Sequence, residues 1–238
     1  MQRYGGGAGP GAGLLLWLLL AADGLFIAVH VWAAEARPSH RLLSIEADNG
    51  YPELFQYLKF FWLALLMALL AWRTRALGPL SWSGLFLYLL LDDLLRLHED
   101  GGAALAEAWQ LPAFLGLRAK DLGELAVTAA AALILLPAIA LAWSRGGPVL
   151  RSLSRRLAWL LALLVLVGVG LDLLASAWHP TGWPRLLLGI LEDGGEMVAA
   201  SLMLAVTFGT LQAAWSPVPA GGSARLRACL DNPGEPPA

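Results

Sequence analysis

Six long apolar segments, separated by short polar connections, constrain the fold of this chain more than any other feature. A membrane-spanning helix needs about 20 mostly apolar residues, and each segment reaches or approaches that length. The segments are 14–34, 55–72, 80–97, 122–143, 157–178 and 186–211. Only 14% of the residues are charged, against about 25% in a soluble domain. We therefore predict an all-α, polytopic membrane protein built as a six-transmembrane-helix bundle.

The rest of the chain leaves little room for a second domain. We predict a transmembrane domain over residues 14–213, flanked by tails 1–13 and 214–238 that are rich in Gly and Pro and are expected to be disordered. The stretch 101–117 is too interrupted to span a membrane and is interpreted as an interfacial or re-entrant segment. Cys229 is the only cysteine, which excludes an intramolecular disulfide and a thiolate metal site.

The first apolar segment has a second interpretation. Ala34-Glu35-Ala36 resembles a signal-peptidase site, so this segment could be removed from the mature protein. The apolar run is longer than that of a typical signal peptide and contains Asp23 and His30, which favours a retained helix.

Basic residues predict the orientation, because cytoplasmic loops carry an excess of Lys and Arg. With six spans, one face receives Arg3, Arg73, Arg75, Arg145, Arg151, Arg155, Arg156, Arg225 and Arg227. The opposite face receives only Arg37, Arg41, Arg118, Lys120 and Arg185. We therefore predict that both termini are cytoplasmic and that the protein is a multi-pass component of a bacterial inner membrane.

Acidic residues lie inside the apolar segments and collect toward the outer face. A charge at mid-bilayer costs about 2.5–3.5 kcal/mol, so Glu192, Asp193 and Glu196 alone would cost roughly 8–10 kcal/mol if ionised and unpaired. Residues three, four or seven apart share a helix face. The resulting polar stripes are Asp92/Arg96/Glu99, Asp121/Glu124, Asp172/Ser176/His179 and Glu192/Glu196. A shared, water-filled cavity that opens outward would explain this one-sided distribution.

Carboxylates and imidazoles on facing helices are the ligands of di-metal carboxylate proteins. We therefore predict a divalent metal, iron, manganese or zinc, with the ligand set Asp92, His98, Glu99, Glu124, Asp172, His179, Glu192 and Glu196. Glu196 and Asp93 are the candidate catalytic carboxylates that would transfer protons. Simpler interpretations stay open: Asp92 could pair with Arg96, Glu124 could stabilise a helix N-terminus, and the histidines could lie at the membrane interface.

Other polar residues receive more modest interpretations. Asp121 is interpreted mainly as a helix N-cap. Asp23 and His30 would line the cavity or pair with each other, and Glu53 and Lys59 would serve as interfacial anchors. Gly194 and Gly195 would permit close helix packing or a local distortion.

Several motifs together resemble a family of uncharacterised bacterial multi-pass membrane proteins. The motifs are Tyr57-Leu58-Lys59, Asp92-Asp93 with His98-Glu99, Asp121-Leu122-Gly123-Glu124, and Glu192 through Met197. The resemblance runs from about Glu53 to Leu211. It implies the membrane architecture and the grouping of these acids, and it names no substrate.

Three functions therefore remain open. The first is a metal-dependent membrane enzyme acting on a lipid or an envelope substrate, the second a proton- or cation-coupled transporter or sensor, and the third a structural membrane subunit. The sequence lacks the motifs H-E-x-x-H, G-x-S-x-G, Walker A and G-x-G-x-x-G. The net charge of −2 gives no indication of a nucleic-acid partner, so the lipid bilayer is the only predicted partner.

Overall fold

The computed structural model describes residues 10–36, 41–114 and 116–215, and within these ranges the chain is helical and contains no strand. The elements are α1 (Pro10–Ala36), the short 3-10 helix η1 (Arg41–Leu43), α2 (Tyr51–Thr74), α3 (Leu77–Leu95), α4 (Leu97–Ala108), α5 (Ala119–Ser144), α6 (Pro148–Val165), the π-helical turn η2 (Leu166–Gly170), α7 (Leu171–Trp178) and α8 (Trp183–Trp215). The predicted tails lie largely outside the described residues, although α1 begins at Pro10 and α8 continues to Trp215.

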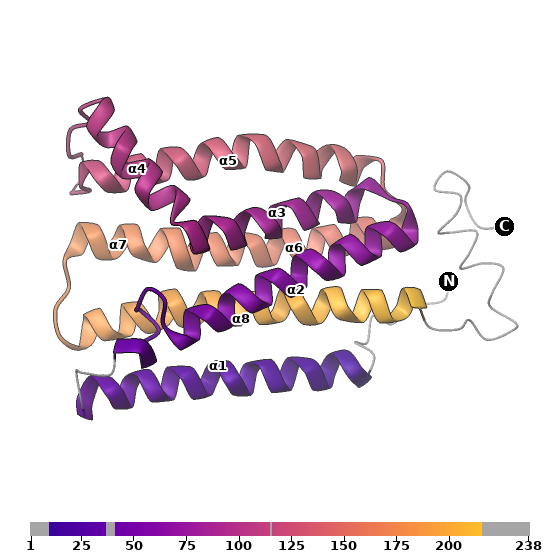
Figure 1. The fold of residues 1–238 in the computed structure, drawn as a ribbon, viewed down its shortest axis with the longest axis horizontal. Helices are drawn as coiled ribbons and strands as arrows, with labels where there is room; N and C mark the ends of the chain where they lie inside the picture. The colour runs from indigo at the N-terminus through magenta and orange to yellow at the C-terminus, as the bar shows by residue number, and fades with distance from the viewer. Residues whose placement is uncertain (1–9, 37–40, 115, 216–238) are drawn as a thin grey trace, which may run out of the picture.

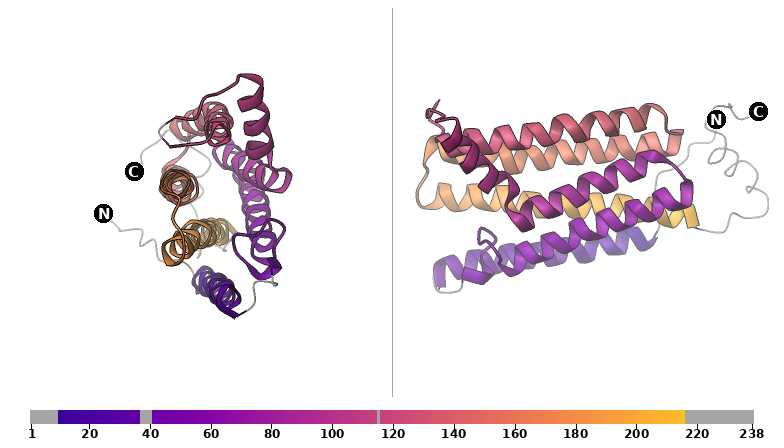
Figure 2. Two further views of the ribbon diagram at one scale, coloured as in Figure 1. Left: turned by 90° about the vertical axis from the view of Figure 1, so that its left-hand side faces the viewer. Right: turned by 45° about the horizontal axis from the view of Figure 1, so that its top comes forward.

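Long helices run side by side as an elongated bundle (Figure 1). α8 lies at its centre, in contact with α1, α2, α6 and η2. α6, η2 and α7 form one continuous helical rod, and the shorter α4 packs obliquely against α5 at one end (Figure 2). α1 begins and α8 ends at the opposite end of the bundle (Figure 1). We call the end that holds α4 the α4 end.

Membrane-spanning character is clear for five helical segments of the described chain. Segments 11–33, 51–74, 119–144, 148–178 and 183–215 are long and apolar enough to cross a bilayer. α3 does not meet that criterion, so six spans are not established by length and composition. Large apolar side chains such as Trp17, Leu133 and Ile134 are 73–77% exposed on the outside of the bundle, as expected of surfaces that contact lipid.

Helix ends follow local sequence signals. Pro52 and Pro148 occupy the first turns of α2 and α6, where the missing N–H of proline is tolerated. α2 and α3 each end at an arginine in the left-handed conformation, Arg75 (φ 50°) and Arg96 (φ 53°). The turn at Arg96 corrects the sequence prediction: the apolar segment that was expected to reach residue 97 ends at Leu95, and α4 begins immediately afterwards in a new direction.

The segment predicted to be interfacial or re-entrant begins inside α4. Gly102 of α4 and Gly123 of α5 bring these two helices into backbone contact. A Cβ atom on Gly123 would lie 2.1 Å from the carbonyl oxygen of Gly102, and one on Gly102 would lie 2.4 Å from the backbone nitrogen of Glu124. Only glycine fits at such a contact, so this pair fixes α4 against the start of α5.

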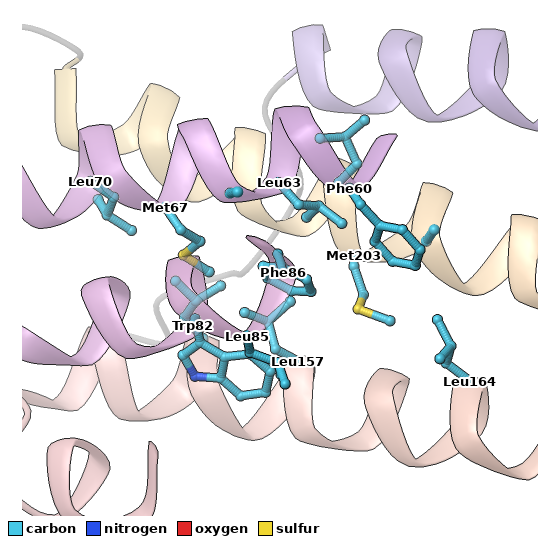
Figure 3. Close-up of a cluster of buried hydrophobic side chains, with 14 of the residues drawn as sticks. Phe60, Leu63, Met67, Leu70, Trp82, Leu85, Phe86, Leu157, Leu164 and Met203 are labelled. Carbon is cyan, nitrogen blue, oxygen red and sulfur yellow. The ribbon is translucent and has the colours of Figure 1, made fainter. Parts of the chain in front are cut away.

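An apolar core of buried side chains lies between the helices (Figure 3). Most of its side chains come from α2, α3, α6 and α8, and they include Leu63, Met67, Phe86, Leu157 and Met203, all 0% exposed. Because lipid tails are themselves apolar, van der Waals packing rather than the hydrophobic effect holds such contacts together inside a membrane. The indole N–H of Trp82 donates to the Ser154 hydroxyl over 3.0 Å, so the one polar group of this large side chain is satisfied.

Candidate functional site

An acidic pocket lies at the α4 end, with a cavity volume of about 160 Å³. Its walls come from the 41–50 segment, the start of α2, the α3–α4 junction and the middle of α8. Carboxylates dominate the lining: Glu46, Asp48, Glu53, Asp93, Glu99, Asp193 and Glu196. Four of the candidate site residues line this pocket: Asp93, His98, Glu99 and Glu196.

Three acids at the rim of the pocket have basic partners, and we call them the rim carboxylates: Glu46, Asp48 and Glu99. Arg96 pairs with both Asp48 and Glu99. Arg185 reaches Glu46 over 3.2 Å. These pairs tie the 41–50 segment to the α3–α4 junction and to α8. The proposed pair between Asp92 and Arg96 does not form, because the left-handed turn at Arg96 directs its side chain to other acids.

Asp92 binds His98 instead. Its two carboxylate oxygens contact the backbone N–H and the Nδ1 atom of His98, each over 2.9 Å. The carboxylate of Asp92 stabilises the imidazolium form and raises the pKa of His98, and this effect outweighs burial, which acts in the opposite direction. The negative charges of Glu99 and Asp93 act in the same direction as Asp92. Asp92 therefore holds the start of α4 and its imidazole in place.

The inner part of the pocket contains three acids without such partners, which we call the inner carboxylates: Asp93, Asp193 and Glu196. In the described part of the chain, their side-chain oxygens make no hydrogen bond and no ion pair. Glu196 lies against the π-helical turn, since a Cβ atom on Gly168 would be 1.8 Å from its Oε1. The absence of a side chain at Gly168 thus makes room for this carboxylate.

Gln56 of α2 adds an unpaired oxygen to the same wall. Its side chain is 6% exposed and lines the pocket. The Nε2 group donates to the backbone carbonyl of Glu196 over 3.4 Å, whereas Oε1 is buried and has no partner among the described residues. Rotating the amide by 180° would place Oε1 against that carbonyl, so the hydrogen bond of Nε2 sets the orientation. The wall of the pocket at Gln56 therefore contains a buried acceptor that lacks a donor in the described chain.

The remaining predicted ligands lie away from this pocket. Glu124 pairs with Lys120 over 3.0 Å. Asp172 and Glu192 are half-buried on α7 and α8 and do not line the pocket. His179 is exposed at the end of α7, in the left-handed conformation (φ 52°). Asp121 accepts hydrogen bonds from the backbone N–H (2.9 Å) and guanidinium (2.6 Å) of Arg118. The N-cap of α5 is Arg118, so the interpretation of Asp121 as the N-cap was wrong: Asp121 lies three residues further on and completes a capping box with Arg118.

The predicted ligands do not form a metal site within the described residues. Within residues 10–36, 41–114 and 116–215, no three His, Cys, Asp or Glu side chains come close enough together to hold one ion. The eight predicted ligands are instead spread over the α3–α4 junction, α5, α7 and α8.

A second polar site, which we call the buried network, lies deeper in the bundle. Lys59 donates from Nζ to Asp23 Oδ1 (2.9 Å), to the Met197 carbonyl (2.8 Å) and to Ser201 Oγ (3.4 Å). Ser201 in turn donates to Asp23 Oδ2 over 2.6 Å. All three side chains are 0% exposed, so the network joins α1, α2 and α8 with every donor and acceptor engaged.

This network corrects two interpretations drawn from the sequence. Lys59 is a buried partner of Asp23 and not an interfacial anchor, and Asp23 does not pair with His30. The His30 Nδ1 atom instead lies 3.1 Å from Ser44 Oγ. The burial of Lys59 could have been predicted, because Phe55, Gln56 and Leu63, at i−4, i−3 and i+4, lie on the same buried face of α2. Nothing in the sequence indicated that its partner would be an acid of α1.

The predicted role of the two α8 glycines is confirmed as close packing. A Cβ atom on Gly194 would lie 3.0 Å from Ile27 of α1, and one on Gly195 would lie 3.3 Å from Val167 of η2. The local distortion lies on the facing helix, at η2, and not in α8. π-helical turns inside α-helices occur frequently at functional sites, and this one borders Glu196.

Comparison with known proteins identifies a family and no activity. The family model described as "Domain of unknown function (DUF8692)" matches residues 13–210. The match covers all five apolar helical segments almost completely, together with the pocket and the buried network. No curated protein and no solved structure matches the chain.

Proposed function

Because the chain belongs to the family described as "Domain of unknown function (DUF8692)", its activity has to be inferred from the site, and we propose that it is an integral membrane protein whose acidic pocket binds a cationic ligand. The observation that carries the proposal is the contrast within the pocket. The rim carboxylates have Arg96 and Arg185, whereas the inner carboxylates find no basic partner among the described side chains. Unpaired carboxylates in a half-buried site are costly unless a cation or a proton compensates them.

We further propose that α3 crosses the membrane as a sixth span. α3 packs along α2 in the bundle (Figure 1). With α3 counted, the chain crosses six times, which agrees with α1 beginning and α8 ending at the same end of the bundle. That end carries Arg73, Arg75, Arg145, Arg151, Arg155 and Arg156. The positive-inside rule then places it in the cytoplasm, with the pocket opening on the outer side of an inner membrane.

A divalent metal remains a proposal within this function. Iron, manganese or zinc could bind only if the inner carboxylates moved toward one another, because metal–oxygen bonds of about 2.0–2.6 Å demand ligands around one point. The measurement is metal content by ICP-MS on detergent-purified protein, wild type beside Asp193→Asn/Glu196→Gln. Stoichiometric metal in the wild type that is lost in the variant would support a metal site in the pocket, which a metal-dependent enzyme requires.

Proton- or cation-coupled transport is the second candidate function. It requires a path from the pocket to the opposite end of the bundle, and the buried network and the apolar core fill that space. A transporter would have to open that core. Acid-dependent cation flux in liposomes would show that it does.

The test of cation binding is the thermal stability of the detergent-purified protein in a panel of Mg²⁺, Mn²⁺, Zn²⁺ and n-butylammonium at constant ionic strength. A ligand that binds the folded state raises the melting temperature, and the stabilisation grows with the logarithm of the ligand concentration once that exceeds Kd. We expect at least one cation to stabilise the wild type and the matched variant Glu107→Gln, whose exposed side chain lies outside the pocket. The same cation should have no effect on Glu196→Gln. Equal responses of all three proteins, or none, would refute the proposal.

A further inference from the structure

The acceptors of the pocket are distributed over separate walls. Asp93 comes from the end of α3, Asp193 and Glu196 from α8, and Gln56 from α2. Within the described residues they do not converge on a common point as metal ligands must. A ligand that satisfies all of them without rearrangement must present several donors that point in different directions.

Gln56 indicates what kind of donor is missing. Gln56 lines the pocket, its Oε1 is buried and lacks a partner in the described chain, and the amide is held in that orientation by the Glu196 carbonyl. An N–H group would satisfy this neutral oxygen, and a protonated amine carries three such groups around one charge. The two other N–H groups of the same ammonium could donate to two of the inner carboxylates, and its single positive charge would offset one of their charges.

Part of the pocket lining is apolar. Ile45, Ala47 and Met197 are 6%, 7% and 3% exposed, and with Pro52 they line the cavity beside the acids. A hydrated metal ion makes no favourable contact with such a wall. A short hydrocarbon chain does, since removing its CH₂ groups from water is favourable.

The size of the cavity limits the ligand. The volume of about 160 Å³ is close to that of an engineered cavity of roughly 150 Å³ that accommodates benzene. Drug-sized ligands need roughly 300 Å³ or more. A molecule of about six non-hydrogen atoms therefore fits, and a lipid does not fit as a whole.

We infer that the pocket binds a small primary amine in its protonated form, with the ammonium group between Gln56 and the inner carboxylates and a short alkyl part against Ile45, Ala47 and Met197. This inference rests on the proposed cation-binding function and specifies its ligand class. Gln56 is then a specificity-determining residue, because its oxygen recognises N–H groups in addition to charge.

The test compares three cations on the purified full-length protein in detergent, by isothermal titration at constant ionic strength. n-Butylammonium has the ammonium and the alkyl chain, tetramethylammonium has the same charge and no N–H group, and Mg²⁺ has neither. We expect n-butylammonium to bind at least about tenfold more tightly than the other two, since a hydrogen bond to a charged donor contributes about 1.5–3 kcal/mol.

Two variants sharpen this test. Gln56→Leu should weaken n-butylammonium binding about tenfold or more and leave the weak binding of tetramethylammonium unchanged, whereas Glu107→Gln should change neither. If Gln56→Leu proves unstable, the ranking of the three cations on the wild type decides alone. Equal affinity for n-butylammonium and tetramethylammonium, or tighter binding of Mg²⁺, would overturn the amine inference and leave cation binding intact. No binding of any cation would overturn both.

Discussion

The buried network and the acidic pocket are neighbours that share α2 and α8, yet charged groups are paired in the first and unpaired in the inner part of the second. In the network, Lys59 and Asp23 neutralise each other and Ser201 completes the hydrogen bonding. In the pocket, the inner carboxylates have no such partner in the described chain. The two sites touch through α8, where Met197 supplies its carbonyl to Lys59 and its side chain to the pocket wall. The complete pairing in the network is what a structural role requires, and the unpaired inner carboxylates are the basis of the proposed cation binding.

The strongest test of this contrast is to break the network. Lys59→Met alone leaves the Asp23 carboxylate buried without its cation, and we expect a loss of about 3–5 kcal/mol in the free energy of unfolding. The double variant Asp23→Asn/Lys59→Met removes both charges and should recover most of that loss, because replacing a whole buried ion pair is often neutral. Unfolding titrations in mixed micelles measure both. A double variant as unstable as the single one would contradict the ion-pair explanation.

The second largest loss of stability is expected when the contact between α4 and α5 is disturbed. Gly123→Ala places a Cβ atom against the Gly102 backbone, and we expect about 1–3 kcal/mol of destabilisation from overpacking. Gly84→Ala is the matched control, since nothing lies within 4 Å of its Cβ position. Because α4 carries His98 and Glu99, Gly123→Ala should also weaken cation binding in the thermal-shift assay. A variant with unchanged stability would show that α4 is not fixed by this contact.

Neutralising an inner carboxylate should raise the free energy of unfolding, in contrast to the two changes above. Asp193→Asn removes a half-buried charge that lies near other acids, so we expect the ligand-free protein to gain about 0.5–2 kcal/mol while cation binding is lost. The free energy of unfolding and the thermal shift are measured on the same sample. Loss of stability here, comparable with that of Lys59→Met, would mean that the pocket is as fully satisfied as the network.

The smallest effect concerns His98. Its pKa is raised by Asp92 in the folded protein, so its stabilising contribution is complete below its unfolded value of about 6.5 and is lost as pH rises through the higher folded value. We expect less than about 1 kcal/mol, because the imidazole is partly exposed. Melting temperatures of the wild type and His98→Gln, compared from pH 6 to pH 9, should converge at the alkaline end. A constant difference would exclude the charged pair as its cause.

The positions of the long helices were predictable from hydropathy and turn residues, because apolar length is a local property of the chain. Segment 122–143 became α5 and segment 186–211 became the middle of α8 with only their ends extended. The break at Arg96 was missed, because an arginine in the left-handed conformation carries no strong sequence signature. Because of that turn, Asp92 pairs with His98 and not with Arg96.

By itself, the sequence determined that this protein is helical, belongs in a membrane and concentrates its acids at one end, since composition and spacing along a helix decide those properties. Tertiary structure decided which acids are paired. Lys59 reaches Asp23 because α1, α2 and α8 meet, and Arg96 reaches the rim because the chain turns there. Asp93, Asp193 and Glu196 are left facing the cavity. Pairing depends on distances between residues far apart in the chain, and helical periodicity predicts only which residues share a face of one helix.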